Sequence, residues 1–346
     1  MNRPCPSPYP GPYPSKVLIT GGPDGGGLSS FAEALREGLL EFGIPAEIVP
    51  PADVLSRWRE LRDPHVLKIL STTGVFASLF ARRSICVAHG FPRADVQGWI
   101  KLLAIVLSLK LANRCSELVA VSSYVAVHLR TIFNLRVDAV IHNPMRSLFR
   151  LTAGADAPWR DCITYVGRLH PAKRLDRIFP AICSLVEETP GLRGCIIGDG
   201  ALRDTLQNHV RGNPRIEFHG SLVPEQVRGW LQRTKVFISG CETEALGIAY
   251  LEALSQGCVV VMPACGGGLE IAPAEIGKSI RLLPLTLEHA EVMAVLREAL
   301  TAPPCATNLT GFDASAIAMS YLEADRRRLP QPALAVSNPS PQAGLR

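Results

Sequence analysis

Strand-like and helix-like runs alternate along almost the entire chain, and this alternation restricts the possible folds more than any other feature. In the first half, short apolar runs predict strands at residues 16–20, 46–50, 65–71, 84–89, 117–122 and 137–142, with helices between most of them. In the second half, strand-like runs at 162–167, 194–198, 215–220, 235–239 and 258–262 alternate with helix-like runs at 174–188, 201–211, 224–232 and 245–256. Such alternation predicts parallel sheets joined by crossover helices rather than a sandwich or a helix bundle.

The 346 residues suffice for two such domains, each large enough to bury its own core. Between residues 151 and 160 the composition becomes loop-like, so we place the domain boundary there. We therefore predict an α/β protein with two Rossmann-like domains. The predicted order is a disordered Pro-rich tail at 1–15, an N-terminal domain at 16–150, a C-terminal domain at 151–310, a helix at 311–329 and a disordered tail at 330–346.

Positive charge is concentrated in the first half of the chain. Residues 1 to 150 carry 17 Lys and Arg against 11 Asp and Glu, a net charge of +6, whereas residues 151 to 346 carry 19 against 20, a net charge of −1. This bias favours anionic partners such as lipid headgroups or a lipid pyrophosphate, and the alternative is an ordinary solvated basic surface. No RNA- or DNA-binding motif is present, so we expect no nucleic-acid partner.

The ten cysteines are scattered singly, and no C-x-x-C pair suggests a zinc site. Since the sequence also shows no secretory signal, the expected compartment is the reducing cytoplasm. The longest apolar stretch, residues 99–112, is interrupted by Lys101 and Lys110 and is too short and too charged to span a bilayer. We expect a buried crossover helix there. The alternative is contact with a membrane surface, which Trp99 and the basic first half would favour.

Three segments place candidate ligand groups at predicted strand ends, where open parallel sheets bind ligands. After the strand at 162–167, Gly167 is followed by Arg168 and Lys173, two cations that could neutralise a diphosphate. The next strand runs into a turn formed by Gly198, Asp199 and Gly200, whose glycines would let the backbone approach a ligand. The third is followed by a loop of Ser221, Leu222 and Val223 that could cover a base. The alternatives are surface cations and ordinary strand-to-helix turns.

The fourth segment carries two glutamates, Glu244 and Glu252, with seven residues between them. On a regular helix they would lie roughly 12 Å apart along the axis, which is about the reach of a nucleotide-sugar. A helix start at this point would offer free backbone N–H groups at residues 245 to 248, which bind phosphate well. The alternative is a surface helix with two unrelated glutamates.

Taken in order, these four segments resemble the donor-binding domain of the retaining GT-B glycosyltransferases of family four, glycosyl transferases group 1. The resemblance covers about residues 160–272. It implies that Arg168 and Lys173 hold the donor diphosphate, that Glu244 faces the donor sugar, and that Glu252 binds ribose hydroxyls. The phosphate-binding amides would belong to Ala245, Leu246, Gly247 and Ile248. Leu246 stands where the family usually has Phe, and Ile238 stands where Pro is frequent.

The first half resembles the family's acceptor domain more loosely. The glycine-rich loop at 20–29, with Gly22 and Gly25, resembles the loop that faces the cleft, although a structural turn would look similar. His89 ends a predicted strand where the family often has a histidine that contacts the donor sugar, and a structural histidine is the alternative. Asn143 lies in a segment that resembles the connection to the hinge. The C-terminal helix resembles the one that crosses back to the first domain.

The resemblance implies hexosyl transfer with retention from a nucleotide-sugar. The basic first half and the apolar stretch at 99–112 favour a glycan or lipid-linked acceptor, and we expect a role in cell-surface polysaccharide or glycoconjugate synthesis. Arg168, Lys173 and the helix start would stabilise the leaving diphosphate, so we expect no metal and no cofactor beyond the donor. No D-x-D element stands where a metal-dependent transferase would need it. The alternatives are a non-catalytic paralogue that binds a sugar nucleotide and a non-hydrolysing sugar-nucleotide epimerase. The expected location is the cytoplasm, at the inner face of the membrane if lipid is contacted.

Overall fold

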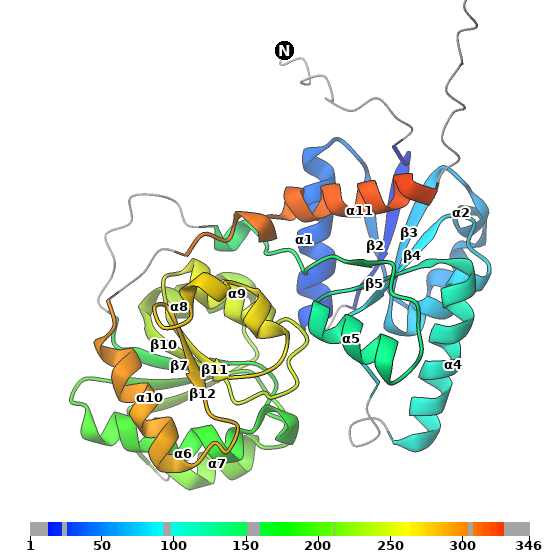
Figure 1. Ribbon diagram of the computed structural model, residues 1–346. Coiled ribbons are helices and arrows are strands. Elements are labelled where there is room, and N and C mark those ends of the chain that lie inside the picture. The colour runs from blue at the N-terminus through cyan, green and yellow to red at the C-terminus, as the bar shows by residue number, and fades with distance from the viewer. Residues whose placement is uncertain are drawn as a thin grey trace, which may run out of the picture.

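The computed structural model describes residues 13–22, 26–92, 98–150, 160–210, 212–303 and 307–328. They form two α/β domains, each built on a parallel sheet with helices on its faces, and this confirms the predicted fold class (Figure 1). The predicted tails lie almost wholly outside the described residues. At the start of the described chain, the backbone N–H of Ser15 donates to the carbonyl oxygen of His65 at 2.8 Å, which attaches this segment to the first sheet.

The first domain contains a sheet that has six strands within the described residues, in the order β2-β1-β3-β4-β5-β6. The strands are β1 (Lys16–Thr20), β2 (Ala46–Val49), β3 (Val66–Ser71), β4 (Ser84–Ala88), β5 (Glu117–Ala120) and β6 (Ala139–Val140). All neighbouring strands are parallel. The order changes direction between β1 and β3, so the crevice that this kind of sheet offers to a ligand opens beyond their carboxyl ends.

Helices and short 3₁₀ segments cover this first sheet. They are α1 (Gly27–Glu41), η1 (Val54–Arg57), α2 (Trp58–Arg62), η2 (Thr72–Leu79), α4 (Trp99–Cys115), α5 (Ser123–Thr131) and η3 (Ser147–Phe149). In α1 the buried residues recur at helical spacing, with Phe31, Leu35 and Leu39 fully enclosed. This face holds α1 against the sheet.

The second domain contains a sheet with six strands in the described part of the chain, in the order β12-β11-β10-β7-β8-β9. The strands are β7 (Cys162–Val166), β8 (Arg193–Ile197), β9 (Ile216–Gly220), β10 (Thr234–Ile238), β11 (Val259–Pro263) and β12 (Ile280–Leu283). The order reverses between β7 and β10. The segments that follow these two strands carry Arg168, Lys173 and Glu244. The edge strand β12 was not predicted.

The second sheet is covered by helices on both faces. They are η4 (Pro171–Lys173), α6 (Leu175–Glu188), α7 (Arg203–Val210), α8 (Pro224–Arg233), α9 (Ile248–Ser255), η5 (Gly267–Glu270), η6 (Pro273–Glu275) and α10 (His289–Thr301). The predicted helix at 245–256 begins three residues later than expected, because Gly247 takes a left-handed conformation (φ +89°) just before α9. Glu244 lies in the loop before α9, so Glu244 and Glu252 do not lie on one regular helix.

Two apolar clusters form the core, and one of them crosses the domain boundary. It extends from the first sheet to the α8 and α9 side of the second sheet, and contains Phe149 of η3 together with Leu231, Tyr250 and Leu254. The other cluster lies between the second sheet and helices α6, α7 and α10. The strands are continuously apolar because both faces of each sheet are covered.

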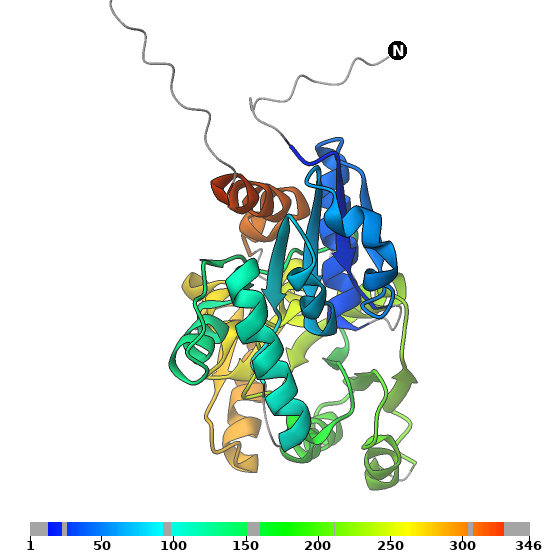
Figure 2. The ribbon, with the colours of Figure 1, turned by 90° about the vertical axis from the view of Figure 1, so that its right-hand side faces the viewer.

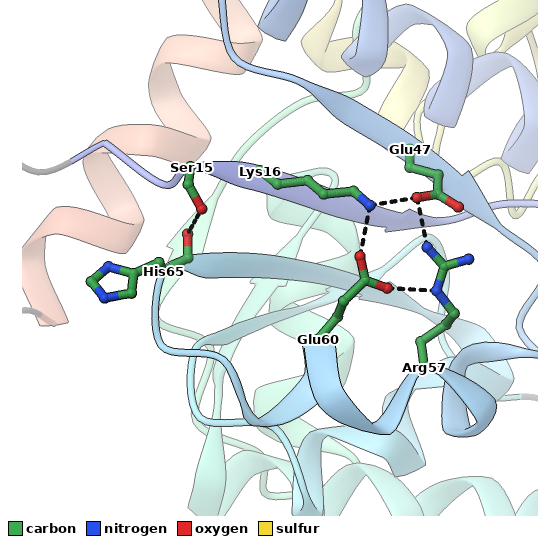
Figure 3. Close-up of polar contacts among 6 residues, drawn as sticks. All are labelled: Ser15, Lys16, Glu47, Arg57, Glu60 and His65. Atoms are coloured by element: carbon green, nitrogen blue, oxygen red, sulfur yellow. Dashed lines mark hydrogen bonds and ion pairs between the residues drawn. The ribbon is translucent and has the colours of Figure 1, made fainter.

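An ion-pair network joins the amino ends of the first sheet to the helix beside it (Figure 3). Lys16, the first residue of β1, lies 2.6 Å from Glu47 of β2 and 2.6 Å from Glu60 of α2. Arg57 contacts the same two carboxylates, at 2.7 and 2.5 Å. Ligands bind at the opposite, carboxyl ends of parallel strands, so this network has a structural role.

The last described helix, α11 (Ala314–Arg328), follows η7 (Thr310–Phe312) and returns from the second domain to the first (Figure 1). It packs against α1, where a Cβ on Gly38 would lie 2.1 Å from the carbonyl oxygen of Ala314. Arg83 and Asp325 form an ion pair with side chains that are only 9% and 4% exposed. This confirms the prediction that the C-terminal helix crosses back.

Helix α4 lies on the outer side of the first domain, facing the viewer in Figure 2. The expectation of a buried crossover helix is wrong for its first half, where Trp99, Ile100, Leu103 and Leu107 are 57–90% exposed. The buried side chains, Leu109 and Ala112, lie in the second half, and Ile105 packs against the core while partly exposed. Among the described helices, none combines the length and the apolar character needed to cross a bilayer.

Candidate active site between the domains

A cleft of about 220 Å³ lies between the carboxyl ends of strands from the two domains. Its lining residues are His89, Gly90 and Phe91 from the first domain, and Arg168, His170, Ala172, Lys173, Cys241, Thr243, Glu244 and Ala245 from the second. The first group follows β4, and the second group follows β7 and β10. The cleft thus opens at the point where the strand order of the second sheet reverses.

Lys173 and Glu244 form the polar centre of this cleft. Lys173 ends η4, and its Nζ donates to Oε2 of Glu244 at 2.6 Å and to Sγ of Cys241 at 3.6 Å. Burial disfavours the ammonium and is the largest single effect on it, but Glu244 and Cys241 together outweigh it, so the pKa of Lys173 is raised. The side chain is therefore a positive charge at neutral pH.

Arg168 provides a second cation at the same wall. Its backbone is fixed because the Tyr165 hydroxyl donates to the Arg168 carbonyl oxygen at 2.9 Å, while its side chain is exposed. Within the described part of the chain, no carboxylate forms an ion pair with Arg168. A guanidinium in this position is available to an anionic group of a ligand.

His89 lies across the cleft, just beyond β4. Its Nε2 is 3.1 Å from Oγ of Ser71, and its ring packs edge-on against Phe31 at 4.4 Å between centroids. Burial lowers the pKa of His89 to about 4, with Asn143 acting weakly in the opposite direction. The imidazole is therefore neutral at neutral pH, and it can offer a hydrogen bond without adding a charge.

The glycine turn at residues 198–200 supports this wall of the cleft without lining it. A Cβ on Gly198 would lie 1.9 Å from the carbonyl oxygen of Gly167, and one on Gly200 would lie 2.5 Å from that of Leu169. The N–H of Leu169 also donates to the carbonyl oxygen of Asp199 at 2.8 Å. The close approach that these glycines permit is to the backbone of the loop that carries Arg168.

The loop before α9 places Ala245 at the cleft, whereas Leu246 and Gly247 are buried behind it and Ile248 begins the helix. Glu252 lies inside α9, is 8% exposed and is not among the lining residues. Burial raises the pKa of Glu252 to about 8, and Arg146 acts in the opposite direction. The two glutamates thus occupy different environments, and Glu244 alone faces the cleft.

The remaining predicted residues lie around the cleft or outside the described residues. Ser221, Leu222 and Val223 form the connection between β9 and α8, with Ser221 and Val223 exposed. Gly22 is half-buried in the loop after β1. Gly25 lies outside the described residues.

Six lining residues were not predicted: Gly90, Phe91, His170, Ala172, Cys241 and Thr243. Each lies within three positions of a predicted residue, so proximity to a strand end is the signal that could have identified them. Phe91 differs from the others because it belongs to an aromatic group. Its ring stacks on His128 at 4.2 Å and meets Tyr124 edge-on at 5.7 Å. Through Tyr124 and His128, α5 contacts the wall of the cleft that Phe91 forms.

Residues 160–291 match the family model described as Glycosyl transferases group 1. Sulfoquinovosyl transferase SQD2 of Arabidopsis thaliana is 30% identical over 161 residues, which are 46% of this chain and 30% of that protein. A GDP-mannose-dependent alpha-(1-6)-phosphatidylinositol dimannoside mannosyltransferase of Mycobacterium tuberculosis is 29% identical over 157 residues, 45% of this chain and 41% of that protein. The chain thus spans less than half the length of these relatives.

The fold also matches solved structures over most of its length. The crystal structure of HepE from Anabaena, in complex with UDP and glucose, superposes with a TM-score of 0.63. The match covers 90% of this chain and 97% of that one, at 18% sequence identity. It therefore includes both sheets.

Proposed function

We propose that this protein transfers a hexosyl group from a nucleotide-sugar to a glycan or lipid-linked acceptor, because residues 160–291 match the model of the glycosyl transferases group 1 family. The observation that carries the proposal is the cleft in which Arg168, Lys173 and Glu244 converge from two neighbouring strand ends. Two cations beside one carboxylate suit a ligand that has a diphosphate at one end and hydroxyl groups at the other.

The chemical task of such an enzyme is to stabilise the diphosphate as negative charge grows on it during bond cleavage. Arg168 is exposed and unpaired among the described residues, so it can bind a phosphate oxygen directly. Lys173 is oriented by Glu244 at 2.6 Å and remains protonated, so its other N–H groups can serve the same anion. Neutral His89 faces them from the first domain and can accept or donate a hydrogen bond at the sugar.

We infer that transfer proceeds with retention of configuration by attack on the face that the diphosphate leaves. A double displacement needs an unpaired carboxylate nucleophile next to the anomeric carbon. Glu244 is the one carboxylate among the described lining residues, and it is paired with Lys173. This pairing favours a role in orientation and charge balance. The stereochemistry of the product, measured by NMR, tests this inference, and an inverted product would refute it.

Donor binding and turnover can be separated experimentally. A thermal-shift screen with UDP-, GDP-, ADP- and dTDP-sugars should identify a donor that raises the melting temperature, because a ligand that binds only the native state stabilises it. That donor should then be consumed when acceptor is added. Tight binding without any turnover would instead favour the non-catalytic paralogue, and conversion of the donor to its epimer would favour the epimerase.

We further propose that the reaction needs no metal ion, since Arg168 and Lys173 supply the positive charge that a metal would otherwise provide. Activity should survive dialysis against a strong chelator. Loss of activity that returns on addition of Mg²⁺ or Mn²⁺ would overturn this part of the proposal.

We propose that the protein works at the cytoplasmic face of a membrane and contacts it through the exposed half of α4. Trp99, Ile100 and Leu103 are 77%, 90% and 70% exposed, and the first half of the chain carries a net charge of +6. Apolar insertion combined with attraction to anionic lipid is the usual basis of interfacial binding. The variant Ile100→Asp should float less with anionic vesicles than the wild type, whereas Ile132→Asp, at the exposed C-cap of α5, should not. Equal flotation of all three proteins would refute the contact.

A further inference from the structure

Four contacts between the domains converge next to Glu244, and one residue on the second domain makes most of them. Glu270 ends η5 and reaches across to the first domain. Its Oε2 accepts from the backbone N–H of Ser123 at 2.7 Å, and its Oε1 accepts from the N–H of Tyr124 at 2.8 Å. Both residues belong to the first turn of α5. A third contact comes from His142, whose Nε2 lies 3.5 Å from Oε2 of the same carboxylate.

The carboxylate of Glu270 provides acceptors for the free N–H groups at the start of α5. The first N–H groups of a helix have no acceptor within the helix, and the helix dipole makes its start favourable for negative charge. Ser122 satisfies only the third of them, because its hydroxyl oxygen accepts from the N–H of Val125. The acceptors for the N–H groups of Ser123 and Tyr124 come from the other domain. The cap of α5 is thus completed only when the domains are together.

The same junction fixes the loop that carries Glu244. The N–H of Gly267 donates to the carbonyl oxygen of Glu244 at 2.9 Å, and a Cβ on Gly267 would lie 1.8 Å from the carbonyl oxygen of Ala245. Ser122 also donates its hydroxyl proton to that oxygen of Ala245. The segment that ends in Glu270, the loop at Glu244 and the start of α5 therefore form one packed unit.

The first-domain wall of the cleft is connected to this unit as well. Tyr124, whose N–H is held by Glu270, presents its ring edge to Phe91 at 5.7 Å between centroids. Phe91 lines the cleft. A displacement of the α5 terminus would thus move one wall of the cleft relative to the other.

We propose that Glu270 is a positioning residue for the transfer reaction. Its carboxylate binds the first N–H groups of α5 and thereby fixes the distance between Phe91 and the loop that carries Glu244. The inference rests on the proposed function for its kinetic part only. The contact of Glu270 with the N–H groups of Ser123 and Tyr124 can be measured without any substrate.

The first experiment is hydrogen–deuterium exchange of the full chain, followed in the peptide that contains Ser123 and Tyr124. In Glu270→Ala these two amides should exchange at least about tenfold faster than in the wild type, since each loses a charge-assisted hydrogen bond. Glu270→Gln keeps one acceptor oxygen and should give an intermediate rate. The matched control is Glu188→Ala, which removes an exposed carboxylate paired with Arg297 inside the second domain. Unchanged exchange in Glu270→Ala would show that Glu270 does not hold these two amides.

The second experiment measures transfer with the donor found in the thermal-shift screen. Glu270→Ala should lower kcat at least about tenfold, Glu270→Gln should recover part of the loss, and the control variant should match the wild type. A purely structural role would instead lower the melting temperature and leave kcat per folded molecule unchanged. Wild-type kcat in Glu270→Ala, with exchange at α5 accelerated, would refute the positioning role. If the wild type turns over no donor, the proposed function fails. The exchange experiment still shows whether Glu270 holds the start of α5.

Discussion

The ion pair between Lys173 and Glu244 can be tested by a double-mutant cycle on turnover. The two side chains meet at 2.6 Å, and each is 23% exposed. A partly exposed pair of this kind contributes on the order of 1 kcal/mol to stability. Removal of Lys173 should therefore lower the melting temperature by only about 2–4 °C, so the variants remain folded under assay conditions.

The effect on catalysis should be much larger than the effect on stability. Loss of one preorganised donor that faces a developing negative charge typically costs about 3–4 kcal/mol, which corresponds to a fall in kcat of about 10²–10³-fold. Lys173→Ala also leaves the carboxylate of Glu244 without its cation, close to where the diphosphate would lie. We expect kcat to fall by this factor in Lys173→Ala and by at least tenfold in Glu244→Gln.

The double variant distinguishes joint action from independent action. Because Lys173 and Glu244 are directly hydrogen-bonded, the cost of removing both should be smaller than the sum of the single costs by about 1 kcal/mol or more. The assay is initial-rate transfer at saturating donor. Lys235→Ala is the matched control, since Lys235 bonds the carbonyl oxygen of Ala302 in the same domain but does not line the cleft. Strict additivity, or wild-type turnover in Lys173→Ala, would refute the assignment of this pair as the centre of the site.

Three further predictions concern stability and are measured by urea unfolding. Burial raises the pKa of Glu252 to about 8 from an ordinary value near 4.5, so the unfolded chain loses this proton first. The free energy of unfolding should thus fall by up to about 5 kcal/mol as pH rises from 4.5 to 8. Glu252→Gln should lack this pH-dependent fall. Equal pH profiles of the wild type and the variant would contradict the prediction. Asp325→Ala should cost about 3–5 kcal/mol because it removes the carboxylate that is ion-paired with the buried Arg83, and Arg83→Met with Asp325→Leu should recover most of that loss. Gly198→Ala should cost several kcal/mol because its Cβ would meet a backbone oxygen at 1.9 Å, whereas Gly229→Ala, with open space around it in α8, should be neutral or stabilising by up to about 1 kcal/mol.

The sequence predicted the order and type of most elements because strands buried on both faces read as continuous apolar runs. The resemblance of four segments to a donor-binding domain predicted that Arg168, Lys173 and Glu244 would serve one ligand. In the structure these residues follow the two strands that flank the reversal of order in the second sheet. Helix α9 was predicted to begin too early because its sequence continues an apolar periodicity through Gly247. Only the backbone conformation of that glycine ends the pattern.

Features that depend on contacts between distant segments were not predictable in this way. The exposure of α4 depends on how far the helix extends beyond its sheet, and its apolar composition alone pointed to burial. Glu270 is 147 positions away from Ser123, so no local pattern indicates that it caps that helix. The same reason applies to Phe91, whose place in the cleft depends on aromatic neighbours on α5.

The return of α11 to the first domain has a consequence for how the protein is made. The first sheet is complete in sequence by residue 140, yet the helix that covers α1 begins at Ala314. At a synthesis rate of about 5–20 residues per second, the ribosome needs roughly 9–38 seconds to add the residues from 140 to the end of this helix. During that interval Arg83 lacks Asp325, and the face of α1 around Gly38 is uncovered. The packing of the first domain is thus completed only after the second domain has been synthesised.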